Sequence, residues 1–201
     1  MSKTLLQINS GLFGEHSQSN HLANAFAQKW LGNHTGGKVQ LRDVTAQPLP
    51  LLDAALVQAL GKKPEQRSAE EQAWVDLSDS LIAEIQAADA LLLAVPMYNF
   101  GVPSQLKAYF DLLARAGVTF KYTETGPVGL LADKPVYIIA ARGGMHAGQA
   151  SDSQSQFLRT FLSFIGLHNQ QFIYAEALNM GDDARQRALT EAGAKINELA
   201  A

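Results

Sequence analysis

Polar and glycine-rich segments follow three of the apolar runs in this chain, and each could contact a phosphate or a planar ring. The first segment, NSGLFGEHSQSN, places two glycines before a hydroxyl-rich stretch that opens a predicted helix. A helix N-terminus exposes unpaired N–H groups and the positive end of the helix dipole, so Ser17, Gln18 and Ser19 could bind a phosphate. Ser17 could equally act as a simple N-cap, because serine is common at that position.

The second segment, PMYNFGVPSQLK, follows an apolar run that ends in proline. It gathers Met97, Tyr98 and Phe100, an apolar and aromatic group that could cover a planar ligand. Asn99 and Gly101 tolerate the unusual backbone angles that a close approach to a ligand requires. A loop folded into the protein core would show the same residue types.

The third segment, ARGGMHAG, follows another buried run. Gly143 and Gly144 allow backbone N–H groups to face a ligand with no side chain between them, although a plain flexible loop would look alike. Arg142 could anchor an anion or pair with a surface carboxylate. His146 fits a solvated loop residue better than a catalytic acid.

Composition excludes several classes of function. The chain has 201 residues with 16 Lys and Arg against 19 Asp and Glu, a net charge of −3, and lacks the basic balance typical of nucleic-acid binding. It contains no cysteine, which excludes disulfides, thiolate nucleophiles and cysteine-based metal sites, and we expect no metal. Motifs of Rossmann sites, P-loops, serine hydrolases and zinc proteases are absent. Without a signal-peptide pattern or a membrane-spanning stretch, we expect a cytoplasmic protein.

Five short apolar runs predict buried strands, at residues 4–8, 38–44, 90–95, 135–141 and 171–175. Apolar residues recur at three- and four-residue steps between these runs, over 22–30, 74–85 and 189–199, and predict helices. Alternating strands and helices predict an α/β fold: a flavodoxin-like, doubly wound, five-stranded parallel sheet with helices on both faces.

We expect residues 1–201 to form one domain with two excursions. Residues 45–67 contain three prolines around a short apolar helix, LLDAALVQAL, and predict a surface arm. Residues 117–131 alternate apolar and polar side chains before the turn signal Thr125-Gly126-Pro127, and predict a hairpin. Because ligands bind at the carboxyl ends of parallel strands, the three segments above should converge there on a mononucleotide with a large planar head.

The sequence resembles the FMN-dependent NADH-azoreductase family, the flavodoxin-like quinone and azo-dye reductases of bacteria. The likeness rests on Ser10 with the SQS turn, on the long blocks PMYNFGVPSQLKAYFD and ARAGVTFKYTETGPVGL, and on the RGG motif. The order and spacing of these blocks match over nearly the whole chain.

The resemblance implies an FMN site. Its members would be Ser10, Ser17, Gln18, Ser19, Pro96, Met97, Tyr98, Asn99, Phe100, Ala141, Arg142, Gly143 and Gly144. Ser10 and the SQS turn would hold the phosphate, residues 97–100 would line the isoalloxazine, and residues 142–144 would lie at its pyrimidine edge. Ala141 stands where the family pattern has serine, so one hydroxyl contact is lost.

The resemblance also implies a ping-pong reaction, in which NADH or NADPH gives a hydride to FMN and a quinone or azo compound then receives it at the same stacked site. We expect Asn99 N–H to face the flavin N5 and the N–H groups of Gly143 and Gly144 to face N1 and O2. With Asn99 and Gly144, Tyr122 completes the expected catalytic set. Tyr122 and Phe164 match aromatic positions that bind substrate and close the pocket, Phe164 from the partner subunit.

Two further points concern partners and alternatives. The segment FLRTFLSFIGL is apolar nearly all round, more than one sheet can cover, and the family is dimeric, so we expect a homodimer. A flavodoxin-type electron carrier is the main alternative, although −3 is a weak charge for steering a redox partner. A regulatory domain that binds some other phosphate is the third hypothesis.

Overall fold

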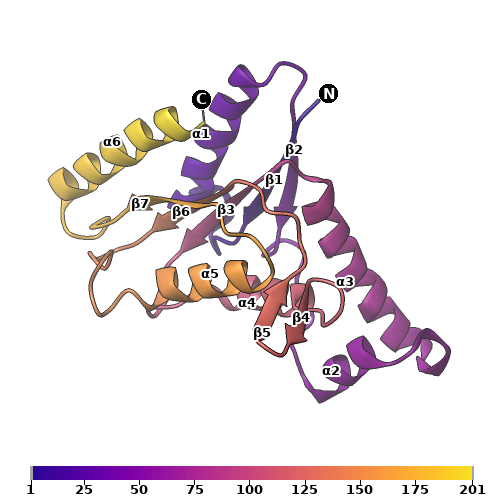
Figure 1. Cartoon of the computed structure of the whole chain (residues 1–201). Helices are drawn as coiled ribbons and strands as arrows, with labels where there is room; N and C mark the ends of the chain where they lie inside the picture. Colours follow the sequence, from indigo (N-terminus) through magenta and orange to yellow (C-terminus); the bar gives the residue numbers. More distant parts are fainter. Residues whose placement is uncertain (1, 201) are drawn as a thin grey trace.

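A five-stranded parallel sheet forms the centre of the molecule (Figure 1). The computed structural model describes residues 2–200. The sheet consists of β1 (Thr4–Asn9), β2 (Lys38–Asp43), β3 (Ala90–Pro96), β6 (Val136–Ala141) and β7 (Gln170–Ala175). Their order is β2-β1-β3-β6-β7, and every neighbouring pair is parallel. The predicted flavodoxin-like sheet is therefore confirmed.

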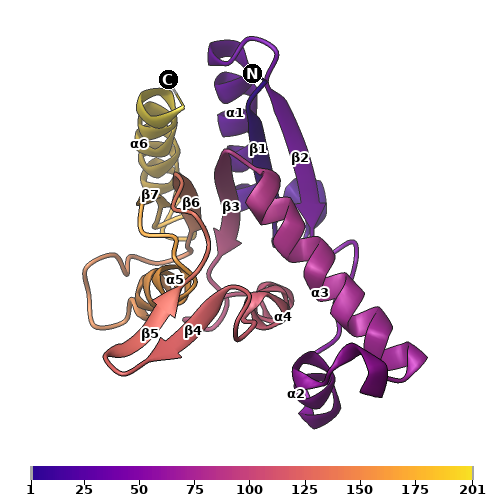
Figure 2. The ribbon, with the colours of Figure 1, turned by 45° about the vertical axis from the view of Figure 1, so that its right-hand side comes forward.

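Helices cover both faces of this sheet (Figures 1 and 2). The helices α1 (Gln18–Asn33) and α6 (Asp182–Leu199) pack on one face. The other face is covered by α3 (Ala69–Ala87), α4 (Ser104–Leu113) and α5 (Ser153–Phe164). The predicted helices lie inside longer ones, because each helix continues through polar residues beyond its apolar stripe. The sequence patterns did not single out α4.

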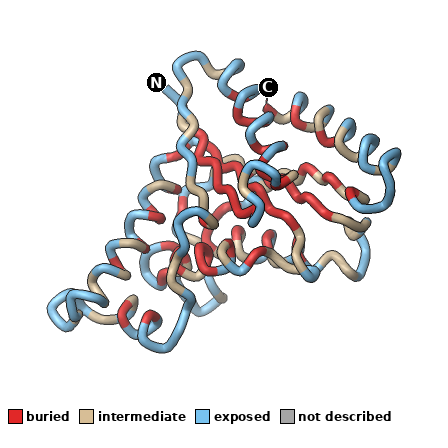
Figure 3. The backbone as a smooth tube through the Cα atoms, turned by 180° about the vertical axis from the view of Figure 1, so that it is seen from behind, coloured by how far each residue is buried: buried red, intermediate tan, exposed pale blue. Residues whose placement is uncertain are grey.

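The strand β3 shows why strands of this sheet have unbroken apolar sequences: its residues are buried on both faces. Leu91, Leu93 and Val95 belong to the core under α3, α4 and α5. The alternate residues Leu92 and Ala94 belong to the core under α1 and α6. Each fully buried leucine contributes about 1.5–3 kcal/mol of transfer free energy, so both faces favour burial of this strand. Figure 3 shows this burial concentrated in the central strands.

The arm at 45–67 contains α2 (Ala54–Gly61) and the 3-10 turn η2 (Pro64–Gln66). Figure 2 shows α2 beside the N-terminal end of α3, away from the sheet. The helix begins at Ala54, later than the apolar string suggested, because the carboxylate of Asp53 accepts a hydrogen bond from Leu56 N–H at 2.8 Å. Leu51 therefore precedes the helix and is exposed.

The hairpin consists of β4 (Phe120–Thr123) and β5 (Gly126–Gly129). Its turn is residues 124–125, so the predicted turn at Thr125-Gly126-Pro127 was wrong by one to two residues. Pro127 lies in β5 opposite Tyr122, which a two-stranded ribbon tolerates because it has edges on both sides. The hairpin packs against the end of α5, where Leu131 N–H donates to Ile165 O at 3.1 Å.

We predict that Gly129→Ala destabilises the fold. A Cβ on Gly129 would lie 2.1 Å from the backbone nitrogen of Gly166, so the hairpin would have to move from α5. Denaturant unfolding should show a loss of about 1–3 kcal/mol in the free energy of unfolding. Gly193→Ala is the control, because a Cβ there meets open space and alanine favours the interior of α6. Equal effects of the two substitutions would contradict this account of the hairpin.

Candidate cofactor site

The three segments meet in one cleft at the carboxyl ends of β1, β3 and β6. A hollow of about 220 Å³ is lined by residues of all three: Ser17, Gln18, Ser19, Pro96, Met97, Tyr98, Ala141, Arg142 and Gly143. A second hollow of about 270 Å³ is lined by Met97, Asn99, Phe100, Gly143 and His146. The two hollows share Met97 and Gly143, so they adjoin at these residues, and we refer to them together as the cleft.

The start of α1 forms one end of this cleft. Ser17 occupies the N-cap position, but its hydroxyl makes no capping hydrogen bond, so capping does not account for this side chain. The Oγ of Ser19 is buried and has no hydrogen-bond partner among residues 2–200. An unpaired buried hydroxyl costs about 1–3 kcal/mol, and an anion that accepts a hydrogen bond from it would remove that cost. The first turn of α1 carries no acidic residue to repel an anion.

The loop before α1 is braced by its own residues. A Cβ on Gly11 would lie 1.9 Å from the Oγ of Ser17, so glycine is needed for this close approach. Asn20, which sequence analysis did not single out, accepts from Gly11 N–H at 3.3 Å and donates to Gly14 O at 3.0 Å.

Ser10 differs from its implied role as a phosphate ligand. Its hydroxyl donates to Ala94 O at 2.6 Å, so its one proton is used within the sheet.

The second segment makes a tight turn at 98–101. Tyr98 and Gly101 exchange backbone hydrogen bonds of 3.1 and 3.0 Å. The residues between them, Asn99 and Phe100, have φ values of 49° and 66°. We expected Gly101 to take the unusual conformation, but Phe100 takes it. Such angles are strained for a bulky residue, and this kind of strain concentrates at functional sites.

Three backbone donors of the second and third segments have no acceptor among the described residues. The N–H groups of Asn99, Gly143 and Gly144 make no hydrogen bond within residues 2–200. A Cβ on Gly143 would lie 2.6 Å from the side-chain nitrogen of Asn179, and one on Gly144 would lie 3.0 Å from the ring nitrogen of His146, so a larger residue would have to displace these side chains. The cleft thus offers unpaired donors from two loops that are far apart in the sequence.

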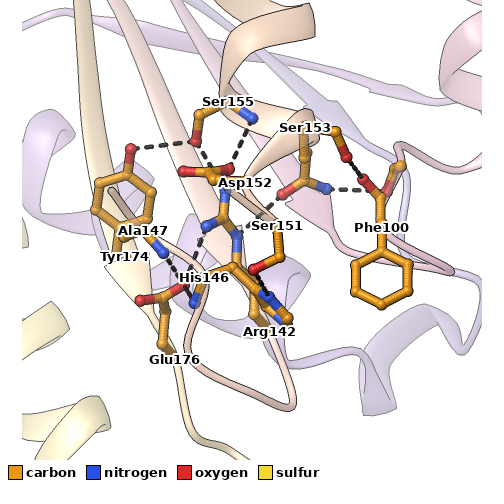
Figure 4. Close-up of polar contacts among 12 residues, drawn as sticks. Phe100, Arg142, His146, Ala147, Ser151, Asp152, Ser153, Ser155, Tyr174 and Glu176 are labelled. Carbon is orange, nitrogen blue, oxygen red and sulfur yellow. Dashed lines mark hydrogen bonds and ion pairs between the residues drawn. The ribbon is translucent and has the colours of Figure 1, made fainter. Parts of the chain in front are cut away.

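The side chain of Arg142 corrects two expectations (Figure 4). Its guanidinium is buried and makes ion pairs with Asp152 at 2.8 Å and Glu176 at 3.0 Å. Further bonds go to Ser155 at 2.8 Å and Gln154 at 3.2 Å. The side chain therefore neither serves as an anion ligand nor pairs with a surface carboxylate. It is the centre of an internal polar network behind the cleft.

Asp152 is the acidic partner of Arg142 at the start of α5. Burial raises the pKa of its carboxyl group, but hydrogen bonds from Ser155 and the Arg142 guanidinium outweigh burial and hold that pKa below its ordinary value. The same carboxylate caps α5 by accepting from Ser155 N–H at 3.1 Å. Asp152 therefore links the network to the helix that supports it.

Other residues of the cleft carried no sequence signal. Phe13, His16, Leu178, Asn179 and Arg185 complete the lining of the first hollow. Arg185 comes from α6 and donates to the side-chain oxygen of Gln18 at 2.9 Å, across 167 residues of sequence. Its charge favours an anion at the start of α1.

Tyr122 and Phe164 lie outside the cleft of their own chain. Neither lines either hollow. Tyr122 is 74% exposed on the hairpin. Phe164 packs against Phe120 with 4.3 Å between ring centroids, and the rings of Phe120 and Tyr122 form a T-shaped pair. The expected closure of the pocket by Tyr122 is therefore not made within one chain.

No helix within residues 2–200 is long and apolar enough to cross a membrane. The same residues contain no group of three or more histidine and acidic side chains arranged to hold a metal ion.

Comparison with known proteins identifies the family. Residues 3–200 match the family described by its flavodoxin-like fold. The chain belongs to this family. It is 62% identical to an FMN-dependent NADH:quinone oxidoreductase of Cellvibrio japonicus, over 89% of each chain. It is 46% identical to the FMN-dependent NADH:quinone oxidoreductase 2 of Pseudomonas fluorescens, over 100% of each. The crystal structure of an azoreductase from Bacillus anthracis superposes with a TM-score of 0.90 and 26% identity, over 100% and 99% of the two chains. These matches confirm the resemblance and the fold seen in the sequence.

We predict that Asp152→Asn removes an acid-sensitive part of the stability. Because the folded pKa of Asp152 is lowered, its carboxylate stabilises the fold above the unfolded pKa, and this stability is lost as pH falls through the folded pKa. Urea unfolding of both proteins should therefore differ most near about pH 7, with the difference shrinking below about pH 4. A difference that stayed constant over this range would show that the Asp152 charge contributes nothing.

Proposed function

We propose that this chain is an FMN-dependent NADH:quinone oxidoreductase that also reduces azo compounds. The observation that carries the proposal is a pair of adjoining hollows at the carboxyl ends of the strands. One is lined by Ser19, whose buried hydroxyl is unpaired, and the other by Asn99, whose N–H is unpaired, while Gly143 lines both. Relatives named for FMN, NADH and quinone cover nearly the whole chain, and a structural relative is named an azoreductase.

The cleft has a donor set that fits FMN. The helix start would hold the phosphate through Ser17, Gln18 and Ser19, with Arg185 adding positive charge beside them. Residues 96–100 would lie along the isoalloxazine ring, and Ala141 would border it without the hydroxyl that the family pattern has there. The side chain of Arg142 would act behind the ring rather than on it.

Bound FMN would supply reversible hydride transfer, first from NADH and then to the acceptor, which gives ping-pong kinetics. In our proposal the chain positions the ring and excludes water from its buried face. The N–H groups of Asn99, Gly143 and Gly144 would donate to ring edges that become more negative on reduction. Reduction of a quinone to the hydroquinone consumes one hydride and one proton, and the proton comes from solvent.

An electron carrier without its own acceptor is not favoured. The relatives are named for both a donor, NADH, and an acceptor, quinone, and the net charge of −3 gives little steering toward a protein partner. We adopt NADH as the donor because the relatives' names specify it.

We further propose that the enzyme is a homodimer in the cytoplasm, where NADH is available. Exposed apolar side chains support the dimer: Leu51 is 70% exposed, Val57 is 54% exposed and Tyr122 is 74% exposed. These residues come from the arm and the hairpin, the two excursions from the sheet. In the dimer, Tyr122 and Phe164 would help to close a substrate pocket that one chain leaves open.

The central test of the proposal is turnover without a partner protein. The purified protein should be yellow, and NADH should be oxidised in the presence of a soluble quinone and FMN alone. Double-reciprocal plots of the initial rate against NADH concentration, measured at several quinone concentrations, should be parallel lines, as ping-pong kinetics predict. A flavin-bound protein that oxidises NADH only when a second protein is added would favour the electron carrier.

We predict that Ser17→Ala combined with Ser19→Ala weakens FMN binding. Each lost hydrogen bond to a charged phosphate contributes about 1.5–3 kcal/mol, so the dissociation constant should rise at least tenfold. Fluorescence titration of the apoprotein measures this constant. Ser80→Ala, at an exposed hydroxyl bonded to its own helix, is the matched control. Unchanged affinity in the double variant would remove Ser17 and Ser19 from the phosphate site.

We predict that the protein sediments at twice the mass of one chain. Val57→Asp should shift it toward the monomer, because a charge would be buried at the proposed interface. A monomeric wild type with full quinone reductase activity would contradict the proposed dimer.

A further inference from the structure

The side chain of Gln154 joins the two loops that line the ring end of the cleft. It lies in the first turn of α5 and is 0% exposed. Its amide nitrogen donates to Pro96 O at 2.9 Å and to Gly101 O at 3.1 Å. Its amide oxygen accepts from the Nε of Arg142 at 3.2 Å. One buried amide therefore contacts the segment after β3 and the segment after β6.

The orientation of this amide is fixed by its partners. Arginine can only donate hydrogen bonds, so the amide oxygen must face Arg142. Backbone carbonyls can only accept, so the amide nitrogen must face Pro96 and Gly101. A neutral glutamine therefore supplies the donor that the two carbonyls need and the acceptor that Arg142 needs, and it leaves none of these buried groups unpaired.

Arg142 continues the connection to the loop that carries the glycine pair. Its Nη1 donates to the Oε1 of Glu176 at 3.0 Å. The same oxygen accepts from the N–H groups of His146 at 2.8 Å and Ala147 at 2.9 Å (Figure 4). A continuous chain of hydrogen bonds therefore runs from the turn at 98–101 through Gln154 and Arg142 to the loop at 143–147.

The turn at 98–101 needs such support. Phe100 holds a positive φ and is 58% exposed, so packing of its ring does little to impose the strained backbone. The bonds to the turn come instead from α5, where Gln154 holds Gly101 O and the hydroxyl of Ser153 donates to Phe100 O at 2.5 Å.

We propose that Gln154 is a positioning residue that sets the distance between the N–H of Asn99 and the N–H groups of Gly143 and Gly144. It acts through Pro96 and Gly101 on one side and through Arg142 and Glu176 on the other. This inference rests on the proposed function, because the donors are taken to face the edges of bound FMN. Loosening the connection changes how well they stabilise the reduced ring relative to the oxidised ring.

The test compares Gln154→Met with Gln170→Met in the full chain. Methionine keeps the length and volume of glutamine but removes both hydrogen-bonding ends. Gln170 is the matched control, because its amide nitrogen bonds to Leu167 O at 2.7 Å and Ser163 at 3.1 Å, at the far end of α5 from the cleft. Both variants lose the hydrogen bonds of the amide nitrogen. Only Gln154→Met also loses a bond to the amide oxygen, the one from Arg142, and only it loses contact with the cleft loops, because the amide oxygen of Gln170 has no partner among residues 2–200. The measurements are the melting temperature of the apoprotein, the FMN dissociation constant, and the spectrum and reduction potential of the bound flavin.

We expect both variants to melt earlier, while only Gln154→Met changes the flavin. Its FMN dissociation constant should rise about tenfold or more, and its flavin spectrum and potential should shift. A tenfold change in the ratio of affinities for oxidised and reduced FMN corresponds to about 30 mV for a two-electron couple. Lower melting with an unchanged potential and spectrum would reduce Gln154 to a structural residue and overturn the proposal.

The experiment also distinguishes failure of the proposed function from failure of the Gln154 variant to fold. If wild type and Gln170→Met bind no FMN, the proposed function itself fails. If Gln154→Met does not fold, Glu176→Gln tests the other end of the same connection. It keeps an acceptor for His146 and Ala147 but weakens the link to Arg142, so the potential must again shift. An unchanged potential in that variant would also overturn the proposal.

Discussion

The parallel register of β1, β3 and β6 is the constraint on which the site depends. Asn9 lies opposite Ala94, and Pro96 lies opposite Ala141, so three strands end within two residues of a common edge. The chain leaves β1 toward one face of the sheet and β3 toward the other, which opens a crevice between the departing segments. The polar network around Arg142 then holds two of these segments at a fixed separation.

The fold was predictable because its signals are local. Continuous apolar runs reflect strands whose alternate residues face different cores, as Leu91 and Leu92 do. The limits of elements were less accessible, because they depend on single side chains such as Asp53, whose carboxylate decides where α2 begins. Pro127 was assigned to a turn because proline favours turns. Its place in β5 depends on the ribbon having no third strand, which short-range sequence patterns do not report.

Site residues could be predicted where a single segment of the sequence contains the signal. They could not be predicted where their position depends on contacts between distant segments. Ser17 and Ser19 could be located because a helix start is visible in the sequence. The role of Arg142 could not, because its partners Asp152 and Glu176 lie 10 and 34 residues away. The approach of Arg185 to Gln18 spans nearly the whole chain. Such contacts follow from the assembled sheet, and they decide which side chains face the ligand and which support the loops from behind.

The most direct measurement of the central claim is a calorimetric titration of the apoprotein with FMN and, separately, with riboflavin, which shares the ring but lacks the phosphate. If the start of α1 binds the phosphate through at least two charge-assisted hydrogen bonds of about 1.5 kcal/mol each, FMN must bind about a hundredfold more tightly than riboflavin. Equal affinities for the two flavins would mean that the helix start takes no part in binding, and the account of this cleft would be wrong.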